Sequence, residues 1–505
     1  MRSISLLSFL LILQFGTAQE AEPKVFVTQH QAAFGPGVRS YTATAGETFL
    51  KNEQGEVEAS IWSTSYTLDG VAAAHERPVT FIFNGGPGSA SVWLHMGLFG
   101  PKLAQVASDA DVDDGAAPFP IIDNPYGLLD LTDLVFIDPV GTGYSIVLNQ
   151  GKEEDFWGLN EDAASIARFI RHWISEHGRW NAPKFLAGES FGTTRAAGVA
   201  HALHQGGQDM ALNGLILISQ ALDYTGSTPV HDNIVAYLTY LPTMAATAWY
   251  HGKAGQDKSL TDFVEESRQF TYDEYAPALF RGNLLPDDQK QAIASRLAYF
   301  TGLSERYILQ ADLRILAPRF RKELLRDEGL TVGGLDSRYK VNEIDQVADR
   351  PTHSDAASIS ISSAYTAALH HHFAHELGVK MDRPYLTSNR KIYPKWNWRP
   401  VSPEQGWEPN YVNVARKLGE VMRTNQSLRV MVANGYYDLV TPFFDAEYTF
   451  SRHGIEREKV IMTYYEAGHM MYVHLPSLMQ QKADLVAFLQ GALPENESKT
   501  ESAGG

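Results

Sequence analysis

Ser190 stands in a pattern that could supply a nucleophile. The motif Gly188–Gly192 (GESFG) follows the apolar residues Phe185 and Leu186, which are typical of the end of a buried strand, and precedes a helix-like stretch over 193–203. This is the setting of a nucleophile elbow, because flanking glycines permit a tight turn that exposes the serine. The chain holds 41 glycines, however, so the motif alone does not separate a reactive serine from an ordinary loop.

A serine hydroxyl needs a base, and the base needs a carboxylate that orients it. Asp438 follows the apolar strand candidate Val430–Ala433, and His469 follows the next one, Val460–Thr463. The chain order Ser, Asp, His is that of sheet-based hydrolases. Since the carboxyl ends of parallel strands meet at one edge of a sheet, these residues are expected to lie together. The pattern therefore predicts a catalytic triad of Ser190, Asp438 and His469.

Acyl transfer also requires hydrogen-bond donors for the negative oxygen of the tetrahedral intermediate. One is expected to be the backbone N–H of Phe191, directly after the serine. The other is expected from the glycine-rich loop Asn84–Ser89, where glycine lets the backbone approach a substrate. This loop lacks the lysine and the spacing of a phosphate-binding loop. A purely structural glycine turn remains the alternative interpretation.

These residues need a scaffold that brings strand ends together. Short apolar runs alternate with helical patterns such as Asp162–His177, whose apolar residues share one face. That alternation predicts an α/β fold with a mostly parallel central sheet covered by helices on both faces. The strand candidates are Val79–Phe83, Asp133–Ile137, Phe185–Ala187, Leu215–Ser219, Val430–Ala433 and Val460–Thr463.

The stretch 232–346 interrupts this rhythm with helix starts and few strand patterns, so it is interpreted as a mostly helical insertion or cap. The first part of the core is then 19–231 and the second part 347–493. The last residues, 494–505, are polar and small, which predicts a disordered tail.

The N-terminus has the features of a cleaved secretory signal over residues 1–18. Arg2 precedes a twelve-residue apolar run, and Gly16, Thr17 and Ala18 are small enough for signal peptidase. The run is short for a transmembrane helix, and no later stretch is long and apolar enough to span a bilayer. The expected location is secreted or periplasmic, without membrane anchoring.

Charge and cysteine content exclude several classes of function. The formal net charge of −17 disfavours nucleic acid and anionic membranes as partners. The absence of cysteine excludes disulfides, thiolate metal sites and cysteine nucleophiles, and in an exported chain it favours a bacterial periplasm. No cofactor is predicted, and the sequence does not specify an oligomeric state.

Two patterns could suggest a metal and are interpreted otherwise. His370–His372 and His375 bring His371 and His375 one helical turn apart, but no third ligand follows at a suitable spacing, and the stretch is typical of a packed helix. The acidic stretch Asp109–Asp114 lacks the glycine and the closing glutamate of a calcium loop. No metal site is predicted.

Taken in chain order, several motifs resemble the successive signatures of the serine carboxypeptidases, which are α/β-hydrolase exopeptidases with a helical insertion. The resemblance runs from about residue 78 to 472 and implies Ser190 as nucleophile, His469 as general base and acid, and Asp438 as its orienter. It implies the N–H groups of Gly86 and Phe191 as the oxyanion hole. The motifs are Asn84–Gly88, Gly100-Pro101, Asn124-Pro125-Tyr126, Asp138–Ser145, Gly188–Gly192 and Gly468-His469-Met470.

The resemblance also implies a site for the free C-terminal carboxylate of a peptide. Glu189 would form this site in a protonated or proton-sharing form, with hydrogen bonds to Asn84 and the N–H of Gly85. Two carboxyl groups that share a proton have a raised apparent pKa, so peptide hydrolysis is expected to favour acidic pH.

Some positions depart from the family pattern. Leu98 stands where many members carry a second glutamate, so the pH preference is expected to be milder. Ser89 replaces a usual cysteine, and Met471 and Tyr472 displace a usual proline. The substrate is therefore expected to be peptide or protein C-termini, with an esterase or acyltransferase on the same triad as the alternative. An aminopeptidase and a catalytically silent binding protein are weaker alternatives.

Overall fold

The computed structural model describes residues 22–34, 37–112, 115–205, 209–399 and 411–491. The predicted signal peptide 1–18 and tail 494–505 lie outside these ranges, as do the last two residues of the acidic stretch Asp109–Asp114. Within the described ranges, no helix combines the length and apolar character needed to cross a bilayer.

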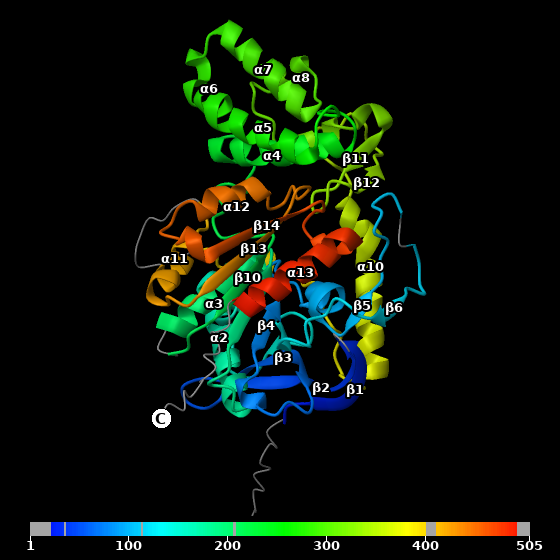
Figure 1. Cartoon of the computed structure of the whole chain (residues 1–505), viewed down its shortest axis with the longest axis vertical. Helices are drawn as coiled ribbons and strands as arrows, with labels where there is room; N and C mark the ends of the chain where they lie inside the picture. The colour runs from blue at the N-terminus through cyan, green and yellow to red at the C-terminus, as the bar shows by residue number, and fades with distance from the viewer. Residues whose placement is uncertain (1–21, 35–36, 113–114, 206–208, 400–410, 492–505) are drawn as a thin grey trace, which may run out of the picture.

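A ten-stranded sheet forms the centre of the molecule, with strand order β1-β2-β3-β7-β4-β9-β10-β13-β14 and β8 paired to β3 (Figure 1). Pairing is antiparallel from β1 to β7 and parallel from β7 to β14. The strands are β1 (Val25–Phe34), β2 (Gly37–Lys51), β3 (Val57–Leu68), β4 (Val79–Phe83), β7 (Asp133–Asp138), β8 (Ile146–Val147), β9 (Lys184–Glu189), β10 (Gly214–Ile218), β13 (Arg429–Gly435) and β14 (Val460–Tyr465).

Helices cover both faces of the sheet because alternate residues of the parallel strands point to opposite sides. On β10, Leu215 and Leu217 pack in the core with α2 (Leu159–Glu176), α3 (Phe191–Gln205), α11 (Ala415–Thr424) and α12 (Phe443–Phe450). Ile216 and Ile218 pack in the opposite core with α10 (Ala356–His371) and α13 (Leu475–Gly491). This is the predicted arrangement, a mostly parallel sheet flanked by helices.

All six strand candidates from the sequence correspond to sheet strands, with ends that differ by at most two residues. The antiparallel strands β1 to β3 were not among the candidates. They extend the sheet on the side away from β14 and pack Tyr41, Trp62 and Tyr66 into one of the two cores.

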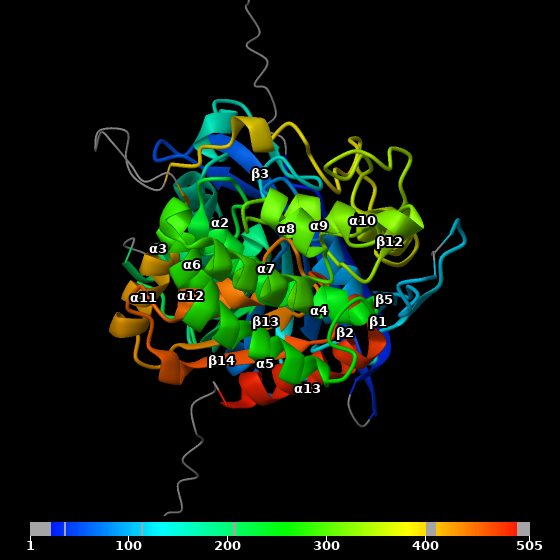
Figure 2. The same ribbon diagram turned by 90° about the horizontal axis from the view of Figure 1, so that it is seen from above.

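A helical cap lies between β10 and β13 and covers one end of the sheet (Figures 1 and 2). It has its own apolar core, which includes Leu439 from the turn after β13. Its elements are α4 (Ile234–Tyr250), α5 (Leu260–Phe270), η4 (Thr271–Tyr275), α6 (Ala276–Arg281), η5 (Gly282–Leu284), α7 (Asp287–Thr301), α8 (Glu305–Gln310), α9 (Ala317–Glu323), η6 (Arg326–Glu328), β11 (Leu330–Val332) and β12 (Lys340–Asn342).

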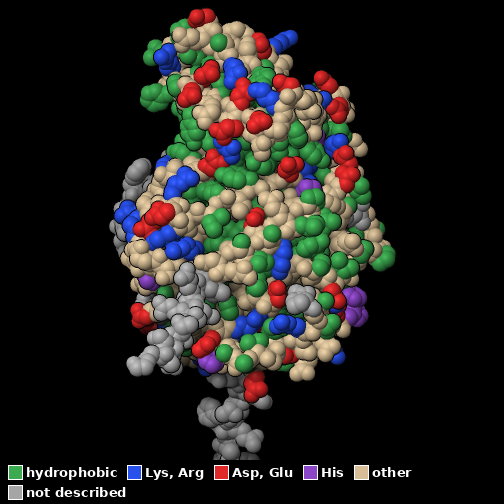
Figure 3. Space-filling model, in the orientation of Figure 1, with side chains coloured by type: hydrophobic (Ala, Val, Ile, Leu, Met, Phe, Trp, Pro, Cys, Tyr) green, Lys and Arg blue, Asp and Glu red, His purple; other side chains and the backbone are tan. Residues whose placement is uncertain are grey.

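The domain limits 232 and 346 remain a prediction; the helices that the structure describes between them are those of this cap. Acidic and basic side chains are intermingled over the face seen in Figure 3, on the cap as well as on the body.

The remaining short elements are η1 (Ala74–Glu76), α1 (Val92–Leu94), η2 (His95–Phe99), β5 (Lys102–Ala104), β6 (Ile121–Asp123), η3 (Glu153–Asp155), η7 (His372–Glu376), η8 (Tyr393–Lys395), η10 (Arg457–Lys459) and η11 (Met471–Val473).

Candidate active site

Ser190 occupies a strained turn between β9 and α3. Its φ is +59°, in the left-handed region that non-glycine residues adopt only when the surrounding structure holds them there. A Cβ on Gly188 would lie 2.2 Å from the carbonyl oxygen of Gly192, and one on Gly192 would lie 2.7 Å from that of Phe83. Both glycines are therefore required by close backbone packing, as expected of a nucleophile elbow.

Asp438 and His469 are paired on the turns after β13 and β14. His469 Nδ1 lies 2.7 Å from Asp438 Oδ2, and both side chains are buried. The other carboxylate oxygen of Asp438 accepts hydrogen bonds from the N–H groups of Val440 at 2.8 Å and Thr441 at 2.9 Å. These bonds fix the carboxylate, which in turn holds the imidazole with Nε2 free for another partner.

Ser190 and His469 line one pocket of about 440 Å³ at the carboxyl end of the sheet. Asn84, Gly85, Gly86 and Glu189 line its polar part. The apolar part includes Trp93, Leu335, Ile361, Val440 and Met470. Six of the eight residues predicted for the site thus line a single pocket. The other two adjoin it: Asp438 is paired with His469, and Phe191 directly follows Ser190.

The glycine-rich loop after β4 packs directly against the elbow. A Cβ on Gly85 would lie 2.6 Å from the backbone nitrogen of Phe191, so only glycine fits there. Asn84 Oδ1 accepts a hydrogen bond from the N–H of Leu94 at 3.0 Å, and its carbonyl oxygen accepts one from Arg195 at 2.6 Å. The N–H groups that could bind an oxyanion are therefore carried by two segments in firm contact.

Glu189 is a buried acid directly before Ser190. Asn84 Nδ2 donates a hydrogen bond to its Oε1 at 2.8 Å, and the hydroxyl of Tyr472 donates one to its Oε2 at 2.6 Å. Burial raises the pKa of Glu189 to about 7, against the opposing effects of His469 and of these two hydrogen bonds. Glu189 therefore exchanges its proton near neutral pH, where an unperturbed carboxyl would be ionised.

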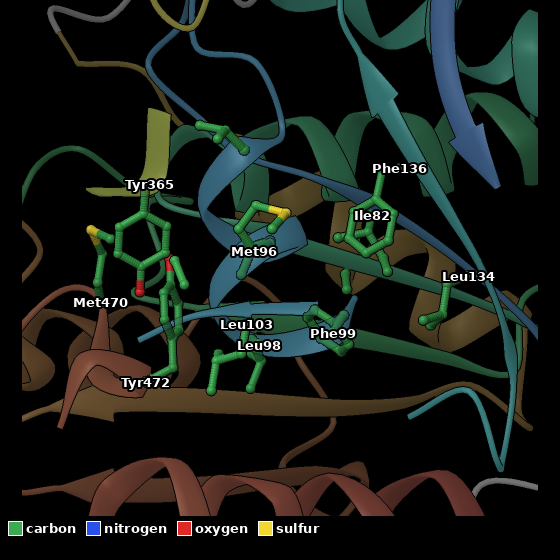
Figure 4. Close-up of a cluster of buried hydrophobic side chains, with 14 of the residues drawn as sticks. Ile82, Met96, Leu98, Phe99, Leu103, Leu134, Phe136, Tyr365, Met470 and Tyr472 are labelled. Carbon is green, nitrogen blue, oxygen red and sulfur yellow. The ribbon is translucent and has the colours of Figure 1, made fainter. Parts of the chain in front are cut away.

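Tyr472 is a site residue that sequence reasoning did not assign. Figure 4 shows it at one end of a buried cluster with Leu98, Tyr365 and Met470. A Cβ on Gly97 would lie 2.6 Å from its ring, which shows how closely η2 approaches it. Among the described residues, Tyr472 rather than the Gly85 N–H supplies the second hydrogen bond to Glu189. The sequence signalled this position only as a departure from the family pattern.

The pKa of His469 reflects two opposing influences. Burial alone would lower it, but the Asp438 carboxylate at 2.7 Å raises it above the ordinary value, with a smaller contribution from Glu189. When Glu189 holds its proton, that contribution disappears, so the imidazole loses its own proton more readily. The two groups therefore titrate as a coupled pair.

Two other motifs that resemble the family pattern, Asn124-Pro125-Tyr126 and Asp138–Ser145, form hydrogen bonds to the segments next to the glycine-rich loop. Asp138 Oδ1 accepts a hydrogen bond from the N–H of Ser91 at 2.8 Å, while Ser145 Oγ donates to the Asp138 carbonyl oxygen at 2.6 Å. Asn124 Nδ2 donates to the carbonyl oxygens of Leu98 and Gly100 at 2.9 and 2.8 Å. These residues hold the loop and η2 in place and do not line the pocket.

The histidine-rich stretch lies on α10 and η7, where His372 is buried and its Nε2 lies 2.8 Å from the hydroxyl of Tyr66. The rings of His371 and His375 are 4.6 Å apart. Within the described residues, no group of three or more His, Cys, Asp or Glu side chains is arranged to hold a metal ion.

The sheet order, the serine turn between β9 and α3, and the histidine–aspartate pair on the turns after β13 and β14 define an α/β hydrolase. A family model described as serine carboxypeptidase matches residues 66–475. The chain therefore belongs to the serine carboxypeptidase family, whose members are hydrolases. A comparison with curated proteins found no match.

Among solved structures, the chain is similar to the prohormone-processing carboxypeptidase Kex1 from Saccharomyces cerevisiae, with 15% identity and a TM-score of 0.55 over 89% of this chain and 91% of that one. This likeness supports the fold. A juvenile hormone epoxide hydrolase from the silkworm Bombyx mori matches 90% of this chain and 79% of its own at 11% identity, with a TM-score of 0.35 that supports no inference.

Proposed function

We propose that the protein removes the C-terminal residue of peptides through an acyl-enzyme on Ser190. The observation that carries this proposal is the buried Glu189, which lies next to the nucleophile with a pKa of about 7 and lines the same pocket. A protonated carboxyl can donate a hydrogen bond to the C-terminal carboxylate of a peptide. An ester or a C-terminal amide has no such carboxylate.

In the proposed reaction, Ser190 Oγ attacks the carbonyl carbon of the last peptide bond while His469 Nε2 takes the hydroxyl proton. Asp438 orients the imidazole through its 2.7 Å contact with Nδ1 and stabilises the imidazolium. The C–N bond breaks as His469 returns the proton to the leaving amine. Water then attacks the acyl-enzyme with His469 again as base. The bond between the acyl carbon and Ser190 Oγ breaks, His469 returns the proton to Oγ, and the shortened peptide leaves with a new carboxyl group.

Two groups of contacts position the substrate. The N–H groups of Gly86 and Phe191 are assigned to the carbonyl oxygen, which becomes negative in the tetrahedral intermediate. Glu189, Asn84 and the N–H of Gly85 are assigned to the terminal carboxylate. The 2.8 Å hydrogen bond between Asn84 and Glu189 supports this assignment, because it holds the two side chains next to each other.

The pKa of Glu189 predicts how peptide hydrolysis changes with pH. Below about pH 7 Glu189 holds its proton and binds a carboxylate, and above it two negative charges face each other. Peptide kcat/KM is therefore expected to fall as pH rises through 7. Leu98, in place of a second acid, makes this dependence milder than that of a paired-carboxyl site.

Substrates and location follow from the family and from the sequence. Peptide or protein C-termini are the proposed substrates. Residues 1–18 support export as a signal peptide, and hence a secreted or periplasmic location.

The deciding experiment compares three substrates with the same N-blocked acyl residue: a dipeptide with a free C-terminus, its C-terminal amide, and an ester. The expected result is clear preference for the free acid at pH 5 to 6 and loss of all turnover in Ser190→Ala. Ser175→Ala, an exposed serine on α2, is the matched control and should behave as the unaltered enzyme. A fluorophosphonate probe should label the control and not Ser190→Ala.

The alternative assignment is an esterase or acyltransferase with the same triad, which Leu98 in place of a second acid favours. Turnover of the ester with none of the free-acid peptide would establish that alternative. It would retain Ser190, Asp438 and His469 as the triad and reject Glu189 as a carboxylate-binding residue.

A further inference from the structure

Arg390 brings a positive charge into the wall of the active-site pocket. It lines the pocket together with Ser190, Glu189 and His469, and its side chain is exposed. Among the described residues, none forms an ion pair or hydrogen bond with its guanidinium, and no other lysine or arginine lines this pocket. A guanidinium in that position is free to bind an anion that enters the pocket.

The backbone that carries Arg390 is fixed to the glycine-rich loop. The N–H of Ala90 donates to the carbonyl oxygen of Thr387 at 3.0 Å, and the N–H of Asn389 donates to that of Gly88 at 2.8 Å. Asn389 Nδ2 also donates to the carbonyl oxygen of Gly141 at 2.8 Å. The arginine therefore extends from a held position next to the loop that contains Asn84 and Gly86.

The acid already in the pocket does not neutralise this arginine. Both oxygens of Glu189 accept hydrogen bonds, from Asn84 and from Tyr472, and the carboxyl holds a proton over part of the neutral range. The neighbouring walls are apolar or uncharged, with Trp93, Ile361 and Met470 among them. A carboxylate on the substrate is the anion that peptide chemistry supplies, and arginine pairs with it through charge-assisted hydrogen bonds.

We propose that Arg390 binds an acidic side chain on the last residue of the peptide, an inference that rests on the proposed function. Glu189 and Asn84 are assigned to the α-carboxylate of that residue. The side chain of that residue is attached to the α-carbon that carries this carboxylate. The pocket wall beside this unit is assigned to the side chain, since Arg390 directly follows Asn389, whose N–H donates to Gly88 in the loop that begins with Asn84. Peptides that end in aspartate or glutamate are therefore the preferred substrates.

The test compares kcat/KM for N-blocked dipeptides that end in Asp, Asn, Glu, Gln or Leu. Each acid and its amide have nearly the same shape, so their ratio isolates the charge. The unaltered enzyme is expected to prefer the acids by about tenfold, the size of one charge-assisted hydrogen bond. Arg390→Gln should remove the preference, and Arg390→Glu should shift it to a dipeptide that ends in Lys. Lys391→Gln removes an exposed charge one residue away and should leave the ratios unchanged.

Three results would overturn the inference. Equal loss on acidic and neutral dipeptides in Arg390→Gln would assign Arg390 to the α-carboxylate instead. A preference for acids only at the penultimate position would place the arginine on the other side of the scissile bond. Turnover of the Leu dipeptide without an acid preference would reject the inference and leave the proposed function intact, whereas no turnover of any free-acid dipeptide would reject the proposed function itself.

Discussion

At the scale of single residues, the proposed binding of a peptide carboxylate depends on whether Glu189 holds a proton. Two donors, Asn84 and Tyr472, stabilise its charged form, while burial stabilises its neutral form. Tyr472 can be altered without touching the nucleophile or the base. Removing its hydroxyl should therefore change the pH dependence of substrate binding without changing the chemical step.

Tyr472→Phe should move the pH limit of peptide binding upward. Loss of the 2.6 Å hydrogen bond removes stabilisation of the Glu189 carboxylate, so its pKa rises further. The pH above which KM for a free-acid dipeptide increases should shift up by about one unit, since a hydrogen bond to a charged group is worth at least ~1.4 kcal/mol. The kcat for an ester should change little.

Tyr465→Phe is the matched control, because Tyr465 also donates to a carboxylate, that of Asp484 at 2.8 Å, away from the pocket. It should leave the KM profile unchanged. A Tyr472→Phe profile that superimposes on that of the unaltered enzyme would show that Glu189 does not bind the peptide carboxylate.

At the scale of elements, a buried ion pair joins the helices that flank the elbow. Arg195 on α3 donates to Asp162 on α2 at 2.6 Å, and both side chains are buried. Arg195 also donates to the carbonyl oxygen of Asn84 and lies over the rings of Phe83 and Phe191. One side chain thus connects α2, α3 and the end of β4.

Asp162→Ala should therefore destabilise the whole fold. It leaves the Arg195 charge buried without its carboxylate, which typically costs about 3–5 kcal/mol of unfolding free energy. Urea unfolding followed by tryptophan fluorescence measures this loss. Glu420→Ala, which removes the partner of exposed Arg416, should cost no more than about 0.5 kcal/mol. Equal losses for the two variants would contradict the structural role given to Arg195.

The elements were predictable from the sequence to different degrees. The strands β4, β7, β9, β10, β13 and β14 are continuous apolar runs, and the ends of these strands locate Ser190, Asp438 and His469. Strand β3 escaped prediction because its polar residues Ser60, Ser63, Thr64 and Ser65 are buried, so no apolar pattern marks it. An alternation of apolar and polar residues marks a strand in the sequence only when one face is polar and exposed, and this strand buries polar residues as well.

The missed pocket residues have a different cause. Tyr472 is brought to Glu189, and Arg390 to the pocket, by contacts between distant segments, with η2 in the first case and with the glycine-rich loop in the second. No local pattern encodes such contacts. The strand ends that carry the candidate triad were therefore more predictable than the contacts that surround the pocket.

At the scale of the whole molecule, buried carboxyls make stability depend on pH. Burial raises the pKa of Asp138 from 3.8 to about 7, against hydrogen bonds from the Ser91 N–H and the Tyr385 hydroxyl. As pH rises from about 4 to 7, the unfolded chain loses this proton while the folded chain keeps it. The free energy of unfolding therefore falls over this window, by at most ~1.4 kcal/mol per pH unit from this group.

Asp138→Asn should remove that part of the slope. The variant's free energy of unfolding, measured by urea titration at pH 4, 5.5, 7 and 8.5, should fall less with pH than that of the unaltered protein. Other buried carboxyls contribute to both proteins, so the difference between the two curves is the informative quantity. Asp257→Asn, at an exposed position, should reproduce the unaltered curve. An unchanged slope in Asp138→Asn would mean that Asp138 is ionised in the folded protein throughout.

The placement of the cap between β10 and β13 has a consequence for biosynthesis. Ser190 and Glu189 precede the cap, whereas Asp438, His469 and Tyr472 follow it, and the Glu189–Tyr472 contact spans 283 residues. At ordinary ribosomal speeds the second group emerges on the order of tens of seconds after the first. A nascent or prematurely terminated chain thus contains Ser190 without His469, the base in the proposed mechanism. On that mechanism, the protein gains the ability to cut other chains only after the segment that follows the cap has been made.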